Sequence, residues 1–151
     1  MAGVVRSRSE LQQLTPAQKR VLQHVAAGLT NQEAPQVLGM QPGTVIGHLL
    51  SVGYKFGVTS RAAKVHAALA SRQITAPAAE TSAPDLTAGE LRLLRAVATQ
   101  SGREQIAVAA KVAPADVNPR VQDLVAKANA RNSAHLVGLA HTWGLLEASD
   151  R

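Results

Sequence analysis

Residues 14–34 have the sequence LTPAQKRVLQHVAAGLTNQEA and residues 38–49 have the sequence LGMQPGTVIGHL. Thr15, followed by Gln18 three positions later, is typical of a capping box, in which each side chain binds the backbone of the other residue. Pro16 suits the first position of a helix. Further helix-start signals follow at Thr30–Glu33, Pro42 and Ser60. Together these signals predict helices near 15–27, 31–38, 42–56 and 60–70.

Apolar residues in the third predicted helix recur at the spacing of one helical face. The positions are i, i+4, i+7 and i+11, so this stripe is expected to face a core. The four residues are Val45, Leu49, Val52 and Phe56.

The same organisation recurs in the second half of the chain. A shift of 72 positions aligns residues 14–74 with residues 86–146 without a gap, and twelve aligned positions are identical. Composition alone would give about five identities. Thr87 with Glu90 repeats the first capping box, and Pro114 opens a third segment. This half is predicted to contain helices near 87–100, 103–111, 114–128 and 132–143.

The repeat divides the chain into four parts. These are a basic N-terminal arm at 1–13, a first unit at 14–74, a linker at 75–85 that is rich in Ala, Pro, Ser and Thr, and a degenerate second unit at 86–146. A unit of about 60 residues buries only about 60% of its unfolded surface. We therefore expect the two units to share a core or to form a dimer.

Composition narrows the classes of function. Aromatic residues make up 2% of the chain, too few for the stacking platforms that hold single-stranded nucleic acids. No cysteine is present, which excludes disulfides and thiolate metal sites and fits a reducing cytoplasm. No apolar run approaches about 18 residues, and residues 1–13 lack the apolar core of a signal peptide. The Ala-, Arg- and Gly-rich composition suggests a bacterium, so we expect a cytoplasmic bacterial protein.

The net charge of +6 is concentrated in the first half. Residues 1–75 contain eight basic and two acidic residues, a net charge of +6, whereas residues 76–151 contain eight of each and are neutral. A basic first half favours a polyanionic partner, because phosphates attract Lys and Arg.

Residues 14–74 resemble the C-terminal DNA-binding domain of the LuxR/NarL family of bacterial transcription regulators. The two stretches quoted above and YKFGVTSRAAKVHAAL at 54–69 fall where that family has its opening helix, turn, recognition helix and dimerising fourth helix. The resemblance implies an all-α helix-turn-helix unit whose third helix enters the major groove of double-stranded DNA. Gly39 matches the turn glycine. Carried over by position, the resemblance assigns DNA-backbone contacts to Asn31, Thr44, His48, Lys55 and Arg61.

The chain departs from the family at the base-reading positions. The family usually has Lys after the Thr-Val pair and reads bases from that position, the next one and the one four residues after the Lys. Ile46, Gly47 and Leu50 occupy these places, and none can form a side-chain hydrogen bond with a base edge. If Ile46 and Leu50 lie outside the core they form an apolar strip of the kind that marks a protein contact. In a different helical register they would be core residues.

Both units contain residues that disfavour the predicted helices. Pro35 in the second helix is expected to remove one backbone hydrogen bond, and Gly47 and Gly53 each weaken the third helix by about 0.5–1 kcal/mol relative to Ala. In the second unit Pro119 falls inside the third helix, and Lys111 takes the place of the turn glycine.

The second unit carries polar residues at the base-reading positions. Asn118 and Gln122 correspond to Ile46 and Leu50, and Arg120 corresponds to His48. Asn, Gln and Arg can bind adenine and guanine edges with two hydrogen bonds, so the three are candidates for DNA contact. Asp116 and Asp123 on the same helix would repel phosphates, and a solvated helix face explains the pattern at least as well.

The sequence contains no recognisable catalytic or metal-binding constellation. It has no phosphate-binding glycine loop, nucleophile elbow or pair of carboxylates, and its five histidines show no metal-ligand spacing with carboxylates. We therefore expect a protein that is not an enzyme and that uses no cofactor, metal or small-molecule substrate.

Two functions remain open. The first is a DNA-binding transcriptional regulator without a sensing domain, located at the nucleoid, in which the basic first unit supplies most of the attraction for phosphates. The second is a protein-interaction module that keeps the helix-turn-helix shape, has lost base reading and pairs with another regulator as a homodimer or heterodimer. Its predicted contacts are the Ile46 and Leu50 strip, or the fourth helices around Val65, Leu69, Val137 and Leu139.

Overall fold

The computed structural model describes residues 13–150, so the predicted arm at 1–13 lies almost entirely outside the described residues. The described part contains eight α-helices and no strand, which confirms the all-α prediction. Seven helices begin and end within one residue of the predicted bounds. The helices are α2 (Pro16–Ala26), α3 (Ala34–Leu38), α4 (Pro42–Phe56), α5 (Arg61–Ala70), α6 (Ala88–Thr99), α7 (Arg103–Ala110), α8 (Pro114–Lys127) and α9 (Ser133–Thr142).

The predicted start signals act as helix caps. Thr15 and Gln18 form a reciprocal capping box, in which the Gln18 N–H donates to Thr15 Oγ1 at 3.1 Å. In each cap a side-chain oxygen accepts a hydrogen bond from a backbone N–H that has no partner within the helix. The capping residues are Thr15 at α2, Ser60 at α5, Thr87 at α6 and Asn132 at α9.

The helix that differs from its prediction is α3, which begins at Ala34. The three residues before it form a turn, which Thr30 and Glu33 close by binding each other's backbone N–H at 3.2 and 3.0 Å. Pro35 therefore lies in the first turn of α3, where an N–H would have no helical acceptor. The prediction that Pro35 removes a helical hydrogen bond is wrong.

The turns that precede α4 and α8 share one backbone conformation. Gly39, at the C-terminal end of α3, has φ 66°, and Lys111, at the C-terminal end of α7, has φ 60°. Both values lie in the left-handed region, where a side chain is disfavoured. Pro119 lies inside α8, as predicted.

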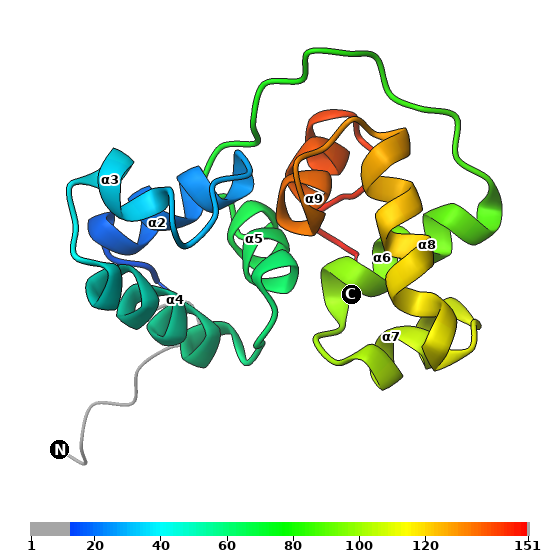
Figure 1. Cartoon of the computed structure of the whole chain (residues 1–151), viewed down its shortest axis with the longest axis horizontal. Helices are drawn as coiled ribbons and strands as arrows, with labels where there is room; N and C mark the ends of the chain where they lie inside the picture. The colour runs from blue at the N-terminus through cyan, green and yellow to red at the C-terminus, as the bar shows by residue number, and fades with distance from the viewer. Residues whose placement is uncertain (1–12, 151) are drawn as a thin grey trace, which may run out of the picture.

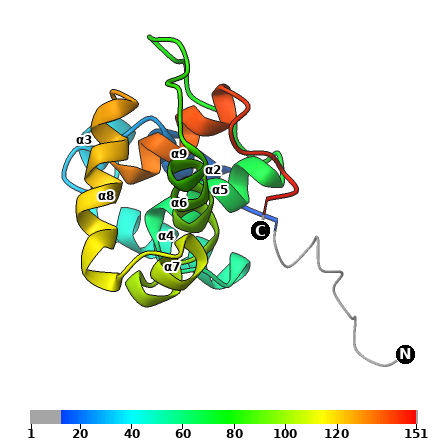
Figure 2. The same ribbon diagram turned by 90° about the vertical axis from the view of Figure 1, so that its right-hand side faces the viewer.

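The helices form two groups joined by a long connection without helix at 71–87 (Figure 1). Helices α2 to α5 lie on one side and α6 to α9 on the other, with α5 and α9 facing each other in the middle (Figure 1). Helix α5 packs against α9 and α6, and α9 also packs against α2. Turned by 90°, the molecule shows α8 along one margin and the connection rising beyond the helices (Figure 2).

The two groups of helices share one hydrophobic core, as expected for units of this size. The predicted stripe of α4 is buried at Val45, Leu49 and Val52, and Phe56 packs partly buried against the core. The equivalent residues of α8 and its C-cap, Val117, Val121, Leu124 and Ala128, are all buried.

The fourth helix of each group is covered within the chain. The prediction that α5 and α9 offer an apolar surface to another regulator is wrong, because the residues concerned lie in the interior and the two helices pack against each other instead. Their exposed fractions are 0% for Val65, 9% for Leu69, 0% for Val137 and 4% for Leu139.

Polar contacts also join the two groups. Arg131 Nη2 lies 2.7 Å from Glu33 Oε2, and Asn132 Nδ2 donates to the Gly28 carbonyl at 2.9 Å. The Arg131 guanidinium lowers the pKa of Glu33 to about 2. These contacts fix the loop before α9 against the loop that follows α2.

Candidate nucleic-acid interface

Helix α4 presents one long face to solvent. Ile46 is 46% exposed, Leu50 66% and Tyr54 93%. The helical register predicted from the sequence is therefore confirmed, and the alternative in which Ile46 and Leu50 are core residues is excluded.

The first half of this face is unobstructed. Thr44 is exposed and His48 is partly exposed. A Cβ atom added at Gly43 or Gly47 would meet no other atom within 4 Å. Because glycine has no side chain, a ligand could approach the backbone of α4 closely here.

Lys55, near the end of α4, holds the start of α2. Its Nζ donates to the Gln13 carbonyl at 2.9 Å and to Gln18 Oε1 at 2.8 Å. The equivalent Lys127 of α8 binds Glu90 Oε1 at 2.9 Å. Lys55 therefore supports the capping box of α2 in addition to carrying a positive charge.

Arg61 and Asn31 are brought together at the start of α5. The guanidinium donates to Asn31 Oδ1 and, at 2.6 Å, to the Leu29 carbonyl. Burial lowers the pKa of Arg61. The two residues fix the loop before α3 against α5 and so position the helix-turn-helix.

The candidates in the second half lie on α8, on the other side of the paired α5 and α9 (Figure 1). Asn118, Arg120 and Gln122 are exposed, and so are Asp116 and Asp123 on the same helix. The face therefore combines groups suited to base edges with carboxylates that repel phosphates.

Sequence reasoning missed Lys64. It is 6% exposed, and it comes so close to α4 that a Cβ atom at Gly53 would lie 2.8 Å from its Cε. Burial and the nearby charge of Arg61 lower the pKa of Lys64. The glycine inside an otherwise regular helix was the available signal, since such a glycine often marks a close approach.

A second missed feature is a pair of histidines between the two groups of helices. His66 Nδ1 lies 2.8 Å from His141 Nε2, and His66 Nε2 lies 2.8 Å from the carbonyl of Asp150. A carbonyl only accepts, so His66 Nε2 carries a proton and, in the neutral ring, Nδ1 accepts from His141. Burial and His66 lower the pKa of His141 to about 4. The two histidines are 75 positions apart in the sequence, so no short-range spacing could have predicted their contact.

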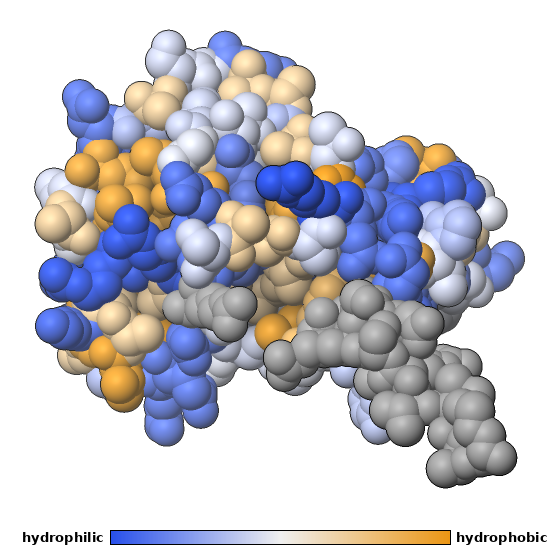
Figure 3. All heavy atoms as spheres, turned by 180° about the vertical axis from the view of Figure 1, so that it is seen from behind, coloured by the Kyte–Doolittle hydropathy of each residue, from blue (hydrophilic) through white to orange (hydrophobic). Residues whose placement is uncertain are grey.

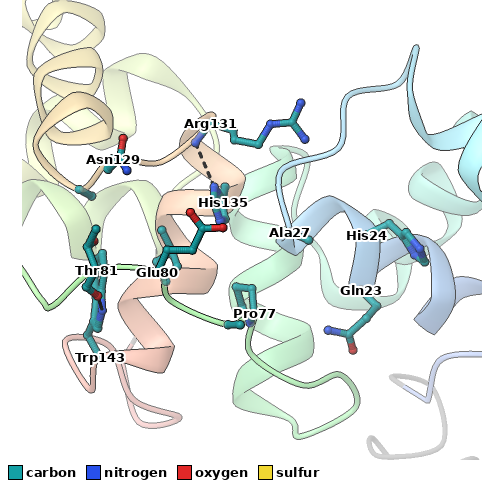
Figure 4. Close-up of a pocket in the computed structure, with 13 residues that line it drawn as sticks. Gln23, His24, Ala27, Pro77, Glu80, Thr81, Asn129, Arg131, His135 and Trp143 are labelled. Atoms are coloured by element: carbon teal, nitrogen blue, oxygen red, sulfur yellow. Dashed lines mark hydrogen bonds between the residues drawn. The ribbon is translucent and has the colours of Figure 1, made fainter.

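A cleft of about 490 Å³ lies between α2, the connection and α9 (Figure 4). Several of its polar groups have partners within the chain. Trp143 Nε1 donates to the Thr81 carbonyl at 3.1 Å, and His135 Nδ1 accepts from the Arg131 N–H at 3.0 Å. The first contact holds the connection against the end of α9, and the second fixes the start of α9.

The described residues offer neither a metal-binding cluster nor a membrane-spanning helix. Between residues 13 and 150, no group of three or more His, Cys, Asp or Glu residues could hold a metal ion. Within the same range, no helix is both long and apolar enough to cross a membrane. Seen from behind, the surface is a patchwork of hydrophilic and hydrophobic areas (Figure 3).

Comparison with known proteins bears on the first group of helices. No curated protein and no solved structure matched the chain. A family model matched residues 12–68, which contain α2, α3, α4 and most of α5. The matched family is described as bacterial regulatory proteins of the luxR family, so this segment, which is less than half of the chain, is similar to members of that family.

Proposed function

We propose that the protein is a DNA-binding transcriptional regulator that docks α4 on double-stranded DNA. The observation that carries the proposal is the exposed outer face of α4 within the segment that matches the luxR family. The excess positive charge of residues 1–75 supports it, because neutralised phosphates release counterions and so strengthen binding.

Recognition of individual bases through α4 is expected to be weak. Ile46 and Leu50 can contact a thymine methyl group but cannot form hydrogen bonds with base edges. Thr44 and His48 remain available for the DNA backbone. Most of the affinity would then come from phosphates, which fix position without specifying sequence.

We further infer that residues 86–146 are a degenerate second copy of this domain. Helices α6 and α9 begin 72 positions after α2 and α5. Lys55 with Gln18, and Lys127 with Glu90, form the same contact in the two halves. Left-handed residues recur at the same interval, in the pairs Gly39 and Lys111, Gly57 and Asn129, and Arg72 and Gly144.

The packing supports a pseudo-twofold arrangement, in which the two halves of one chain are related like the subunits of a dimer. Helix α5 packs against α6, and α9 packs in the corresponding way against α2. Exchanging the two halves therefore maps these contacts onto each other, which is the property of a twofold interface. In this arrangement α4 and α8 would present two recognition helices from one chain.

DNA binding is tested with a fluorescently labelled duplex of mixed sequence in about 50 and about 200 mM salt. We expect binding that weakens at least tenfold at the higher salt. The double variant T44A/H48A should bind more weakly than wild type, whereas Q105A on the exposed face of α7 should bind equally well. Absence of binding to any duplex in the lower salt would refute the proposal.

A second candidate function, a protein-interaction module, is favoured by the exposure of Ile46, Leu50 and Tyr54. The double variant I46K/L50K separates the two functions. Gained DNA affinity together with lost capture of a partner regulator would favour the interaction module. Unchanged partner capture would count against it.

A further inference from the structure

A pocket of about 450 Å³ adjoins the C-terminal half of α4. We call it the Lys64 pocket, and its defining residues are Leu50, Gly53, Tyr54, Val58, Thr59 and Lys64. Lys64 reaches it from α5 and is 6% exposed, whereas Leu50 and Tyr54 are largely exposed. The pocket thus combines a lysine whose side chain is mostly buried with apolar groups open to solvent.

The ammonium of Lys64 has no counter-ion within the described chain. In residues 13–150, its Nζ pairs with no carboxylate and donates no hydrogen bond to another residue. A charge that is partly removed from water and lacks a counter-ion is unfavourable, and burial accordingly lowers the pKa of Lys64. An anion that entered the pocket beside an apolar group would therefore be stabilised by both charge and apolar contact.

The complementary chemistry lies on α7. Val108 is 80% exposed, and Glu104 lies one helical turn before it on the same face. Within residues 13–150, no basic group forms an ion pair with Glu104. We call Glu104, Gln105, Val108 and Ala109, which line a groove of about 440 Å³, the Val108 groove.

The two surfaces lie along one edge of the molecule. The Thr59 and Ser60 N–H groups donate to Ser101 Oγ at 3.0 and 3.3 Å, which joins the loop after α4 to the loop before α7. Figure 1 shows α4 and α7 along the lower edge of the molecule. A patch with a cationic apolar part and an anionic apolar part is complementary to a copy of itself turned by 180°.

We propose that a second copy of this chain docks on this edge, with its Glu104 at Lys64 and its Val108 against Leu50 and Tyr54. A twofold axis forms the same contact twice and closes the assembly as a dimer. The few exposed apolar residues suggest an interface below about 1,200 Å², which is typical of weak, transient association. The inference does not depend on the proposed DNA binding, although the dimer would cover part of α4.

Sedimentation velocity without DNA, from about 10 µM to about 1 mM protein, tests the proposal in the range expected for a weak complex. The sedimentation coefficient of the wild type should rise with concentration. Y54K, V108K, E104K and K64M should each weaken association at least tenfold. D85K, which makes the same charge change as E104K but lies in the connection, should associate like wild type. Thermal unfolding of each variant checks that it is folded.

Mixing Y54K with V108K distinguishes the proposed pairing from other arrangements. The mixed dimer retains one intact contact, between the Lys64 pocket of the V108K chain and the Val108 groove of the Y54K chain. The mixture should therefore associate more strongly than either variant alone. This gain would support the α4-to-α7 pairing directly.

Three results would overturn the proposal. One is a monomer at every concentration. Another is association that Y54K abolishes and V108K leaves unchanged, which would indicate pairing of α4 with α4. The third is a K64M variant that associates like wild type but binds duplex DNA more than tenfold more weakly, which would assign the Lys64 pocket to the DNA surface.

Discussion

Gly47 and Gly53 lie on the same helix in opposite surroundings. A Cβ atom at Gly47 would meet open space, whereas one at Gly53 would lie 2.6 Å from the Val58 carbonyl oxygen and 2.8 Å from Lys64 Cε. The sequence suggested that both glycines merely weaken the helix. For Gly53 the close approach of Lys64 supplies a reason for the glycine.

Alanine substitutions test this difference. G47A should stabilise the protein by about 0.5–1 kcal/mol, because it lowers the backbone entropy lost on folding. G53A should destabilise it by about 1–3 kcal/mol, because backbone atoms must shift to admit the methyl group. Urea denaturation measures both free energies. Equal effects of the two substitutions would show that the environment of Gly53 has been misjudged.

The left-handed turn residues provide a second matched pair. G39A places a side chain at φ 66° and should cost about 1 kcal/mol, whereas K111G removes one at φ 60° and should gain about 0.5–1 kcal/mol. K111A keeps the Cβ atom and serves as the control, with no gain expected. Thermal denaturation distinguishes the three, and a destabilised K111G would contradict the assigned conformation.

At the scale of the helices, most of the fold was predictable because helix starts are local. A capping residue, its partner three positions later and a proline at the first position act over one helical turn, so the sequence displays them directly. Helix α3 was predicted to start too early because Thr30 and Glu33 form the reciprocal contacts of a capping box but close a turn before the helix. Contacts between helices leave few such signals, of which Gly53 was one, and this is why the α5–α9 pairing, the Lys64 pocket and the histidine pair were not predicted.

Helix α8 contains two prolines with opposite expected effects. Pro114 occupies the first turn, and Pro119 lies in the interior and is exposed. P119A restores a backbone donor and should stabilise the protein by about 1–2 kcal/mol, after allowing for the greater freedom of the unfolded chain. P114A is the control and should be neutral or slightly destabilising. Thermal unfolding would expose an error if P114A stabilised more than P119A.

At the scale of the whole molecule, the histidine pair links stability to pH. His141 has a pKa of about 4 in the folded protein, against 6.5 for an unperturbed histidine. The unfolded chain therefore binds more protons between these values, and stability falls as the pH drops from about 6.5 to about 4. Glu33, whose pKa is about 2, adds a loss that begins only below its ordinary value of 4.5.

The substitution H141Q should make the stability of the folded protein less dependent on pH between about 6.5 and about 4. Its side-chain amide can still donate to His66 Nδ1 but does not titrate. We expect the melting temperature of the wild type to fall by several degrees between pH 7 and pH 4.5, and that of H141Q to fall less. H48Q, on the exposed face of α4, should follow the wild type. Parallel curves for wild type and H141Q would exclude the pair as the source.

The packing of α5 against α9 has a consequence for how fully the protein would occupy a DNA site at low concentration. Proteins that read two half-sites as separate subunits must first meet, so their occupancy of DNA falls steeply on dilution. If residues 86–146 are a second helix-turn-helix unit, as proposed above, the two units belong to one polypeptide, and the packing of α5 against α9 sets their local concentration. If both units bind, a titration of a two-half-site operator at nanomolar protein should give a Hill coefficient near one.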